Sequence, residues 1–222
     1  MDFLLILPVL LFSVIIHEVA HGWVALRQGD ATAFMLGRLT LNPIPHIDPF
    51  GSIVVPLIMA LPMLTGHGGG PILGWAKPVP VNPRNYRKYR RGDILVSLAG
   101  IAANLVLAVL FTLLIVGVTY VGRALPALVP TLELVQRMFW WGVNINLVLA
   151  FFNLIPIPPL DGSHVFYYLL PPKLGYKYRQ VGQIGILLVL LLLLFFPPVT
   201  SFFLWPADVL QRFALSFIQV AT

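Results

Sequence analysis

The stretch Phe3–Leu26 reads FLLILPVLLFSVIIHEVAHGWVAL, and Glu18 is its only charged residue. It is long enough to cross a bilayer, because a hydrocarbon core of ~30 Å takes about 20 helical residues. Within it, His17-Glu18-Val19-Ala20-His21 places three ionisable side chains in little more than one helical turn. No basic segment precedes the apolar run, so we expect a retained transmembrane helix rather than a cleaved signal peptide.

The spacing of the two histidines suits a metal ion. Residues four apart lie on one face of a helix, so His17 and His21 can offer two ring nitrogens to one zinc ion, with Glu18 beside them as the base that takes a proton from water. The alternative is a histidine pair satisfied by backbone or neighbouring side chains. Coordination is favoured, because an uncompensated ionisable group near the bilayer centre costs at least ~2.5–3.5 kcal/mol.

Composition indicates an all-α polytopic membrane protein with a single membrane-embedded domain over 1–222. The chain is 59% hydrophobic and 10% charged, with a mean hydropathy of +0.90, whereas soluble domains carry about 25% charged residues. Four segments are long enough to span a bilayer, and we expect transmembrane helices at about 3–26, 94–121, 138–159 and 181–205.

A fifth apolar run, 51–64, is shorter and is broken by Pro56 and Pro62, which favours a re-entrant segment. The segment Gly37–Asn42 alternates polar and apolar residues, as a short membrane-associated β element would. An exposed edge there could pair with an unwound substrate.

The distribution of basic residues predicts the topology. Eight Lys and Arg residues fall between the first and second expected helices and three between the third and fourth, but only Arg123 and Arg137 between the second and third. Cytosolic connections carry the excess of positive charge. We therefore expect four crossings with the N-terminus outside and the histidines toward the cytosolic side of the cell membrane. The cluster Arg84–Arg91 and the net charge of +6 indicate anionic lipid headgroups rather than nucleic acid as the partner.

This topology brings one more acidic residue to the depth of the histidines. The third expected helix runs toward the cytosol. Its end contains Pro156 and Pro158, and Asp161 lies two residues beyond it. A carboxylate there would complete three protein ligands for zinc and leave one position open, as in catalytic sites. The alternative is that Asp161 caps a helix opened by Gly162. Both roles are compatible, but only coordination explains why Asp161 and the histidines coincide.

On four motifs, the chain resembles the site-2 protease family of intramembrane zinc metalloproteases. These are the His-Glu-x-x-His helix at 17–21, Asn153-x-x-Pro156-x-x-Pro159-Leu160-Asp161-Gly162, the pair Gly100-x-x-x-Asn104, and Gly74-Trp-Ala-Lys-Pro-Val-Pro-Val-Asn82-Pro83. The resemblance implies that His17, His21 and Asp161 bind one zinc ion per chain and that Glu18 is the catalytic base. It also implies cleavage of single-pass transmembrane substrates in regulated intramembrane proteolysis. We expect the compact form of the family, without a PDZ domain or a cystathionine-synthase-type domain.

Three further polar residues are candidates for roles in or near the site. Asn153 could orient a substrate carbonyl or stabilise the oxyanion, or it could satisfy backbone groups freed by the prolines. His164 could hold the Asp161 carboxylate from the second shell of ligands. Asn104 is interpreted as a hydrogen-bonding contact between helices rather than a catalytic group.

Two other functions stay open. One is a different membrane metallopeptidase, which would need a glutamate or histidine as third ligand, and no second helix offers one at membrane depth. The other is a membrane protein that uses the His/Asp cluster for ion handling; the intact Glu18 favours hydrolysis. The sequence leaves the substrate, the cleavage position and the oligomeric state undetermined.

Overall fold

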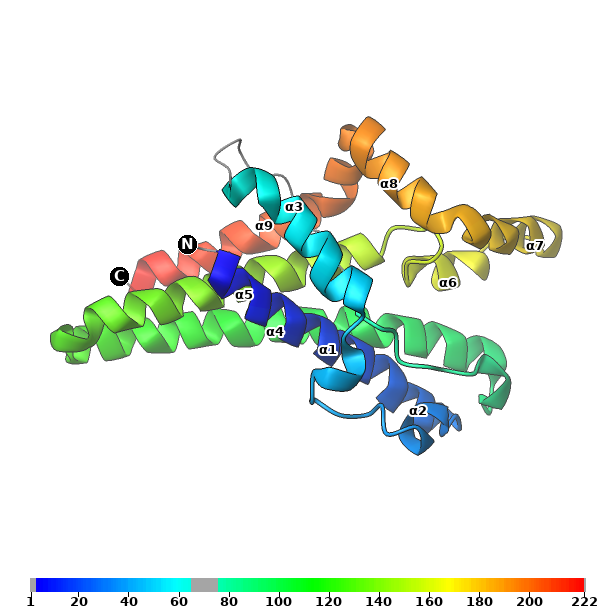
Figure 1. Cartoon of the computed structure of the whole chain (residues 1–222), viewed down its shortest axis with the longest axis horizontal. Coiled ribbons are helices and arrows are strands. Elements are labelled where there is room, and N and C mark those ends of the chain that lie inside the picture. Colours follow the sequence, from blue (N-terminus) through cyan, green and yellow to red (C-terminus); the bar gives the residue numbers. More distant parts are fainter. Residues whose placement is uncertain (1–2, 65–75, 222) are drawn as a thin grey trace.

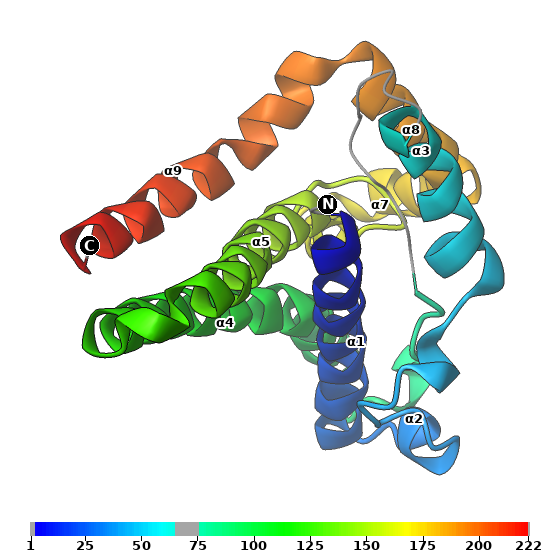
Figure 2. The same cartoon turned by 60° about the vertical axis from the view of Figure 1, so that its left-hand side comes forward.

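The computed structural model describes residues 3–64 and 76–221, and every regular element in these ranges is helical. Three long helices form the centre, namely α1 (Phe3–Gln28), α4 (Tyr89–Ala124) and α5 (Val129–Asn153). Helix α4 packs against both of the others, and α9 (Pro197–Ala221) runs alongside α5 and also contacts α4 (Figures 1 and 2).

The core of this bundle is apolar. It contains aliphatic and aromatic side chains of α1, α4, α5 and α9: Val9, Leu107, Ala108, Phe111, Ile115, Val143, Leu147, Ala207 and Ala214. Gly142 on α5 permits close packing, because a Cβ there would lie 2.6 Å from the Phe111 ring of α4. Burial of this apolar surface stabilises the helix pairs, and many large hydrophobic side chains are left facing outward.

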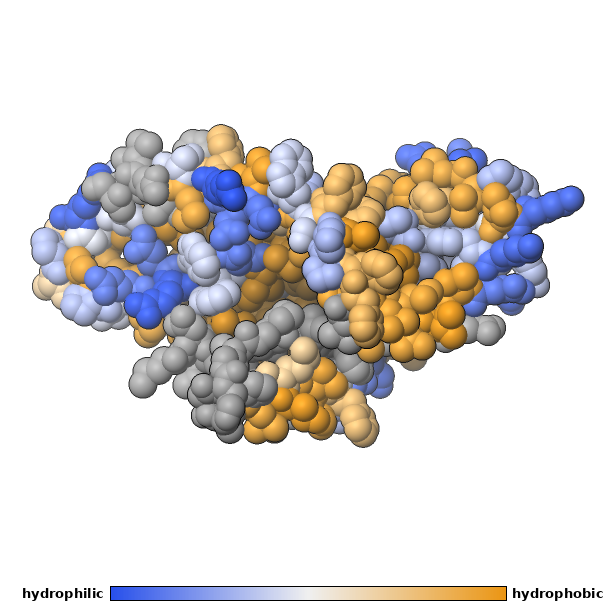
Figure 3. All heavy atoms as spheres, turned by 90° about the horizontal axis from the view of Figure 1, so that it is seen from above, coloured by the Kyte–Doolittle hydropathy of each residue, from blue (hydrophilic) through white to orange (hydrophobic). Residues whose placement is uncertain are grey.

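The outward apolar surface fits a membrane protein. Helices over Leu5–Gln28 and Tyr89–Ala124 are long and apolar enough to cross a bilayer, and the bent pair α8 and α9 would make a third span. Figure 3 shows hydrophilic residues gathered toward the two ends of the long axis, with hydrophobic residues between them. The expected all-α membrane class is therefore confirmed, while the expected count of four crossings stays a prediction.

The connection between α1 and α4 returns to the face on which it begins. The N–H of Arg87 donates to the carbonyl oxygen of Gln28 at 2.8 Å, which ties the start of α4 to the end of α1. Between them lie α2 (Thr32–Met35), a π-helical segment at Pro49–Val54 and α3 (Val55–Leu64). The re-entrant interpretation of 51–64 stays a prediction. Gly74 and Trp75, the first residues of the fourth motif, lie outside the described residues.

The expected β element at 37–42 is wrong, since the structure has no strand in its described residues, which include this segment. Gly37 has a positive φ of 64°, which interrupts an extended backbone. The Arg38 side chain bonds instead to the carbonyl oxygens of Lys77 and Pro78.

The expected helices also have different bounds: α1 and α4 extend beyond 3–26 and 94–121, and the other two differ more. Helix α5 ends at Asn153 rather than at 159, because Pro156 and Pro158 lack the N–H that a continuing helix needs. The expected helix 181–205 is not continuous: α8 (Gly185–Phe195) meets α9 at an angle of 87°. Pro197 and Pro198 explain this bend, since a proline pushes the preceding residue, here Phe196, out of the helical region.

Candidate metal centre

Helix α1 presents both histidines of the first motif to one point. The Nε2 atoms of His17 and His21 lie 3.0 Å apart, and the rings meet edge to face. Both side chains are largely buried, and His17 is only 7% exposed. The four-residue spacing therefore gives the shared face that the sequence predicts.

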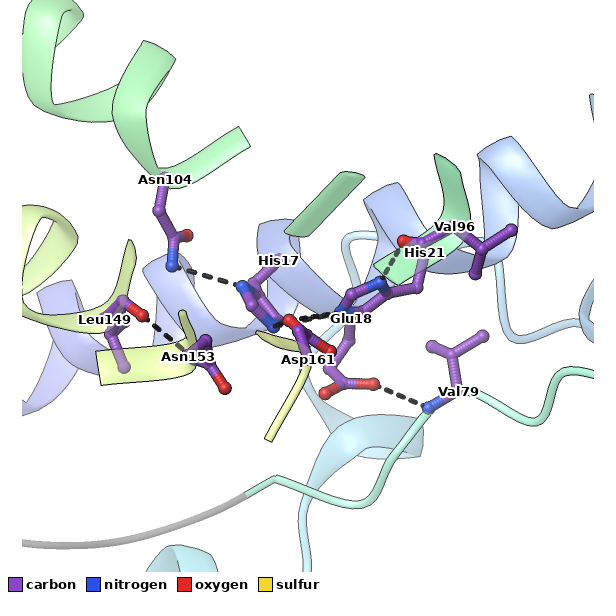
Figure 4. Close-up of polar contacts among 9 residues, drawn as sticks. All are labelled: His17, Glu18, His21, Val79, Val96, Asn104, Leu149, Asn153 and Asp161. Carbon is purple, nitrogen blue, oxygen red and sulfur yellow. Dashed lines mark hydrogen bonds and ion pairs between the residues drawn. The ribbon is translucent and has the colours of Figure 1, made fainter. Parts of the chain in front are cut away.

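Asp161 reaches the same point from the segment that follows α5 (Figure 4). Its Oδ2 atom lies 3.3 Å from Nε2 of His17 and 3.4 Å from Nε2 of His21. The backbone doubles back tightly here, because a Cβ at Gly162 would lie 2.2 Å from the carbonyl oxygen of Leu154. Helix α6 (Gly162–Tyr167) begins directly afterwards, without a capping hydrogen bond from the Asp161 side chain. The carboxylate is thus directed at the histidines and does not cap the helix.

The outer edge of each imidazole has a partner on α4. His21 Nδ1 lies 2.7 Å from the carbonyl oxygen of Val96, an acceptor that requires a proton on Nδ1. The Nε2 atom of His21 is therefore left with its lone pair, the form in which histidine binds metals.

His17 has an equivalent partner in Asn104, whose side-chain amide lies 3.1 Å from Nδ1. The Asn104 oxygen Oδ1 is buried and otherwise unpartnered in the described structure. If the Asn104 amide group is turned by 180°, Oδ1 takes the place of Nδ2 and accepts a hydrogen bond from the Nδ1–H of His17. Both histidines then present an unprotonated Nε2 to the centre.

The residues at this centre fit a zinc ion. The three ligand atoms all lie within 4.8 Å of one another, and two imidazole nitrogens with one carboxylate oxygen form a donor set found in catalytic zinc sites. Among the described residues Asp161 Oδ2 is buried without a hydrogen-bond partner, and a bound cation would compensate its charge.

Gly100 of α4 leaves the space that the imidazole rings of His17 and His21 occupy. A Cβ at Gly100 would lie 2.5 Å from both His17 Cε1 and His21 Nε2. Any side chain there would displace the rings, so Gly100 has a specific role next to Asn104 in the third motif.

Glu18 lies beside the ligands rather than among them. Its Oε2 atom accepts the backbone N–H of Val79 at 2.8 Å, and Figure 4 shows the other carboxylate oxygen pointing away from Val79. This placement leaves Glu18 available for proton transfer.

Asn153 and His164 have neighbours other than the expected ones. Asn153 is the last residue of α5, and its Nδ2 donates to the carbonyl oxygen of Leu149 at 2.9 Å. An oxyanion role would require Asn153 to exchange this bond, and that role stays a prediction. His164 was expected to hold the Asp161 carboxylate, but its Nδ1 lies 3.1 Å from Oδ1 of Asp93.

Asp93 is a buried acidic residue near the start of α4. It is 3% exposed on α4, and it also accepts the Tyr168 hydroxyl at 2.8 Å. Arg179 on α7 (Pro172–Val181) lies 3.8 Å from the same carboxylate. Asp93 therefore ties α6 and α7, and with them the segment that carries Asp161, to the start of α4.

The sequence is similar to those of known proteins. The sequence model of peptidase family M50 matches residues 5–196. YwhC of Bacillus subtilis, provisionally named a zinc metalloprotease, is 40% identical over 198 residues, which cover 89% of this chain and 82% of that protein. Rip2 of Mycolicibacterium smegmatis, with the same provisional description, is 33% identical over 195 residues, or 85% of this chain and 66% of that protein. No solved structure matches the chain.

Proposed function

The chain belongs to peptidase family M50, the site-2 protease family, and from this premise we propose that it is a zinc-dependent intramembrane endopeptidase. It would hydrolyse peptide bonds in or near transmembrane segments of substrate proteins. The observation that carries the proposal is the convergence of His17, His21 and Asp161 on one point, with Glu18 beside them, inside an apolar bundle.

The residues divide the chemistry between them. His17, His21 and Asp161 would hold the ion, and a bound zinc supplies Lewis-acid chemistry that polarises the scissile carbonyl and acidifies a water molecule. The Glu18 carboxylate takes a proton from the attacking water as its oxygen bonds to the carbonyl carbon. The carbon–nitrogen bond then breaks, and Glu18 delivers that proton to the leaving amine nitrogen.

The buried position of the site constrains the substrate. A helical peptide bond is shielded by its own backbone hydrogen bonds and must unwind before it can be attacked. Substrates of this enzyme would be single-pass membrane proteins whose transmembrane helix carries Gly, Pro or Asn near the scissile bond, because those residues lower the cost of unwinding.

The orientation in the membrane follows from the basic residues. Arg87, Lys88, Arg90 and Arg91 are exposed at the start of α4. Arg179 on α7 bonds to the hydroxyl of Tyr89, so the second basic connection lies at the same end of the molecule. We place this end, and the active site with it, toward the cytosolic face of the cell membrane, in contact with anionic headgroups.

The direct test compares the purified chain with Glu18→Gln. The parent should contain about one zinc per chain and cleave candidate single-pass substrates. The variant should keep its zinc and lose cleavage by roughly 10²–10⁴-fold, the contribution of a general base. Equal cleavage by both proteins would contradict the protease mechanism and favour ion handling by the same residues.

A further inference from the structure

A short extended segment, Ala76–Asn82, crosses the face of α1 that carries Glu18. Val79 is buried in the middle of this segment and donates its N–H to the Glu18 carboxylate at 2.8 Å (Figure 4). The segment lies close against α1, because a Cβ at Gly22 would be 2.7 Å from Cγ1 of Val79. Since Pro78 and Pro80 have no N–H, Val79 is the only backbone donor of these three positions.

The segment is held in place before Val79. The N–H of Lys77 donates to the carbonyl oxygen of His46 at 2.9 Å. Arg38 Nη2 donates to the carbonyl oxygens of Lys77 at 2.9 Å and Pro78 at 3.2 Å. His46 is fully buried, and its Nε2 lies 2.9 Å from the carbonyl oxygen of Thr40. These bonds fix the backbone directly before the Val79 amide.

Asp30 holds the segment on the other side of Val79. Its fully buried carboxylate accepts the N–H of Asn82 at 2.6 Å and the side-chain amide of Asn85 at 2.8 Å. Asp30 is two residues beyond the end of α1, the helix that also carries Glu18. The donor at Val79 and the acceptor at Glu18 are therefore fixed relative to one another through the same helix.

We propose that the main-chain N–H of Val79 is a positioning group for Glu18. A glutamate side chain has three rotatable bonds, and a hydrogen bond from a fixed amide to one carboxylate oxygen restricts them. The other oxygen is then presented to the reacting water in a constant geometry. This inference rests on the proposed function, because positioning a base matters only if Glu18 moves protons. The opposite role would be inhibitory, and we call it a plug: the Val79 N–H would block the Glu18 carboxylate and would have to move away before Glu18 could accept a proton.

The first test removes the N–H. Val79→Pro lacks the donor in a segment that already contains two prolines, and kcat should fall by roughly 10–100-fold, as expected for a misplaced catalytic group. KM and zinc content should stay near the parent values, whereas a merely structural defect would change both. Val79→Ala keeps the N–H and should recover most of the lost kcat. Val81→Pro, which inserts the same ring two residues along, is the matched control.

A second readout needs neither zinc nor turnover. In the metal-free protein, amide hydrogen exchange at Val79 should be slow in the parent and at least ~10-fold faster in Glu18→Ala, because the acceptor is gone. Glu133→Ala, which removes an exposed carboxylate elsewhere, should leave exchange at Val79 unchanged.

The outcomes separate this inference from the proposed function. A Val79→Pro protein with the parent's kcat would overturn positioning, and one with a higher kcat would identify the contact as a plug. If Val79→Pro loses zinc or does not fold, Val79 can instead be replaced by its α-hydroxy acid, which swaps only the N–H for an ester oxygen. A fall in kcat then supports positioning, and a kcat equal to that of the parent overturns it. If the parent itself cleaves nothing, the proposed function fails, and exchange at Val79 still reports whether the contact exists.

Discussion

Asn104 lies with its side-chain amide 3.1 Å from Nδ1 of His17, and Asn104 has no exposed surface. The contact joins α4 to the ligand-bearing face of α1. It fixes the orientation of the imidazole ring and determines which ring nitrogen carries the proton. A histidine that binds a metal needs both to be set.

Removing this contact should weaken metal binding without removing a ligand. Asn104→Ala is expected to lower zinc affinity by roughly 10–100-fold, the range seen when partners of ligating histidines are removed. Competition with a zinc chelator measures the affinity directly. Asn144→Ala, on α5, is the control for the loss of an asparagine inside the bundle. Equal zinc affinity in the parent and Asn104→Ala would show that the contact does not support the ligand.

The glycine at position 100 should be similarly sensitive. In Gly100→Ala the new Cβ would meet both imidazoles at 2.5 Å, so the rings must move and zinc content should drop well below one per chain. Gly117→Ala on the same helix meets nothing within 4 Å and should retain zinc. It should also be stabilised by up to ~1 kcal/mol through helix propensity. Zinc analysis of the two purified proteins makes the comparison, and full occupancy in Gly100→Ala would contradict the packing described here.

Asp30 should make the stability of the protein depend on pH. Burial would raise the pKa of its carboxyl, but bonds from Asn82, Thr32 and Asn85 outweigh burial and hold that pKa below its ordinary value. A depressed folded-state pKa adds stability that is complete above the unfolded value, ~3.9, and is lost as pH falls through the folded value.

Asp30→Asn should therefore lower the free energy of unfolding by ~1.5–3 kcal/mol at pH 7, the worth of hydrogen bonds to a charged group. The difference from the parent should shrink below about pH 4. Thermal unfolding in detergent at pH 7 and at about pH 2 would show this, with the exposed Asp208→Asn on α9 as control. A difference that grows as the pH falls would reverse the sign and exclude this account.

Topology can be tested with single cysteines, since the chain has none of its own. Cysteines beside Arg87 and Lys177 should be labelled by impermeant reagent from the cytosol, and one beside Pro130 from outside. The bond between Arg87 and Gln28 requires the α1–α4 connection to return to its starting face. Labelling near Arg87 and near Lys177 from opposite faces would refute the proposed orientation.

The sequence predicts the candidate site better than it predicts the fold around it. His17, Glu18, His21 and Asp161 can be found because each is an ionisable residue in an apolar setting, where burial without a partner is costly. The pair Pro197 and Pro198 indicates the bend near Phe196 in the sequence. The apolar residues on both sides nevertheless predict one continuous helix, so the bend is missed.

Other contacts leave no trace in the residue types. Val79 and Val96 contribute a backbone N–H and a backbone carbonyl, groups that almost every residue possesses, so their residue type does not reveal these contacts. Asp30 and Asp93 look like ordinary acids next to helix ends, and their burial depends on segments distant in the sequence. Only the folded arrangement distinguishes such residues from solvent-facing ones.

The distance along the chain between His17 and Asp161 has a consequence for biosynthesis. A ribosome makes the two histidines and Glu18 early and the third ligand only after α4 and α5, at a rate of ~5–20 residues per second. Until then the base lies next to an incomplete ligand set. The nascent protein would therefore pass through membrane insertion as an inactive precursor, and it would gain hydrolytic capacity only once α5 has packed and the segment beyond it has turned back toward α1.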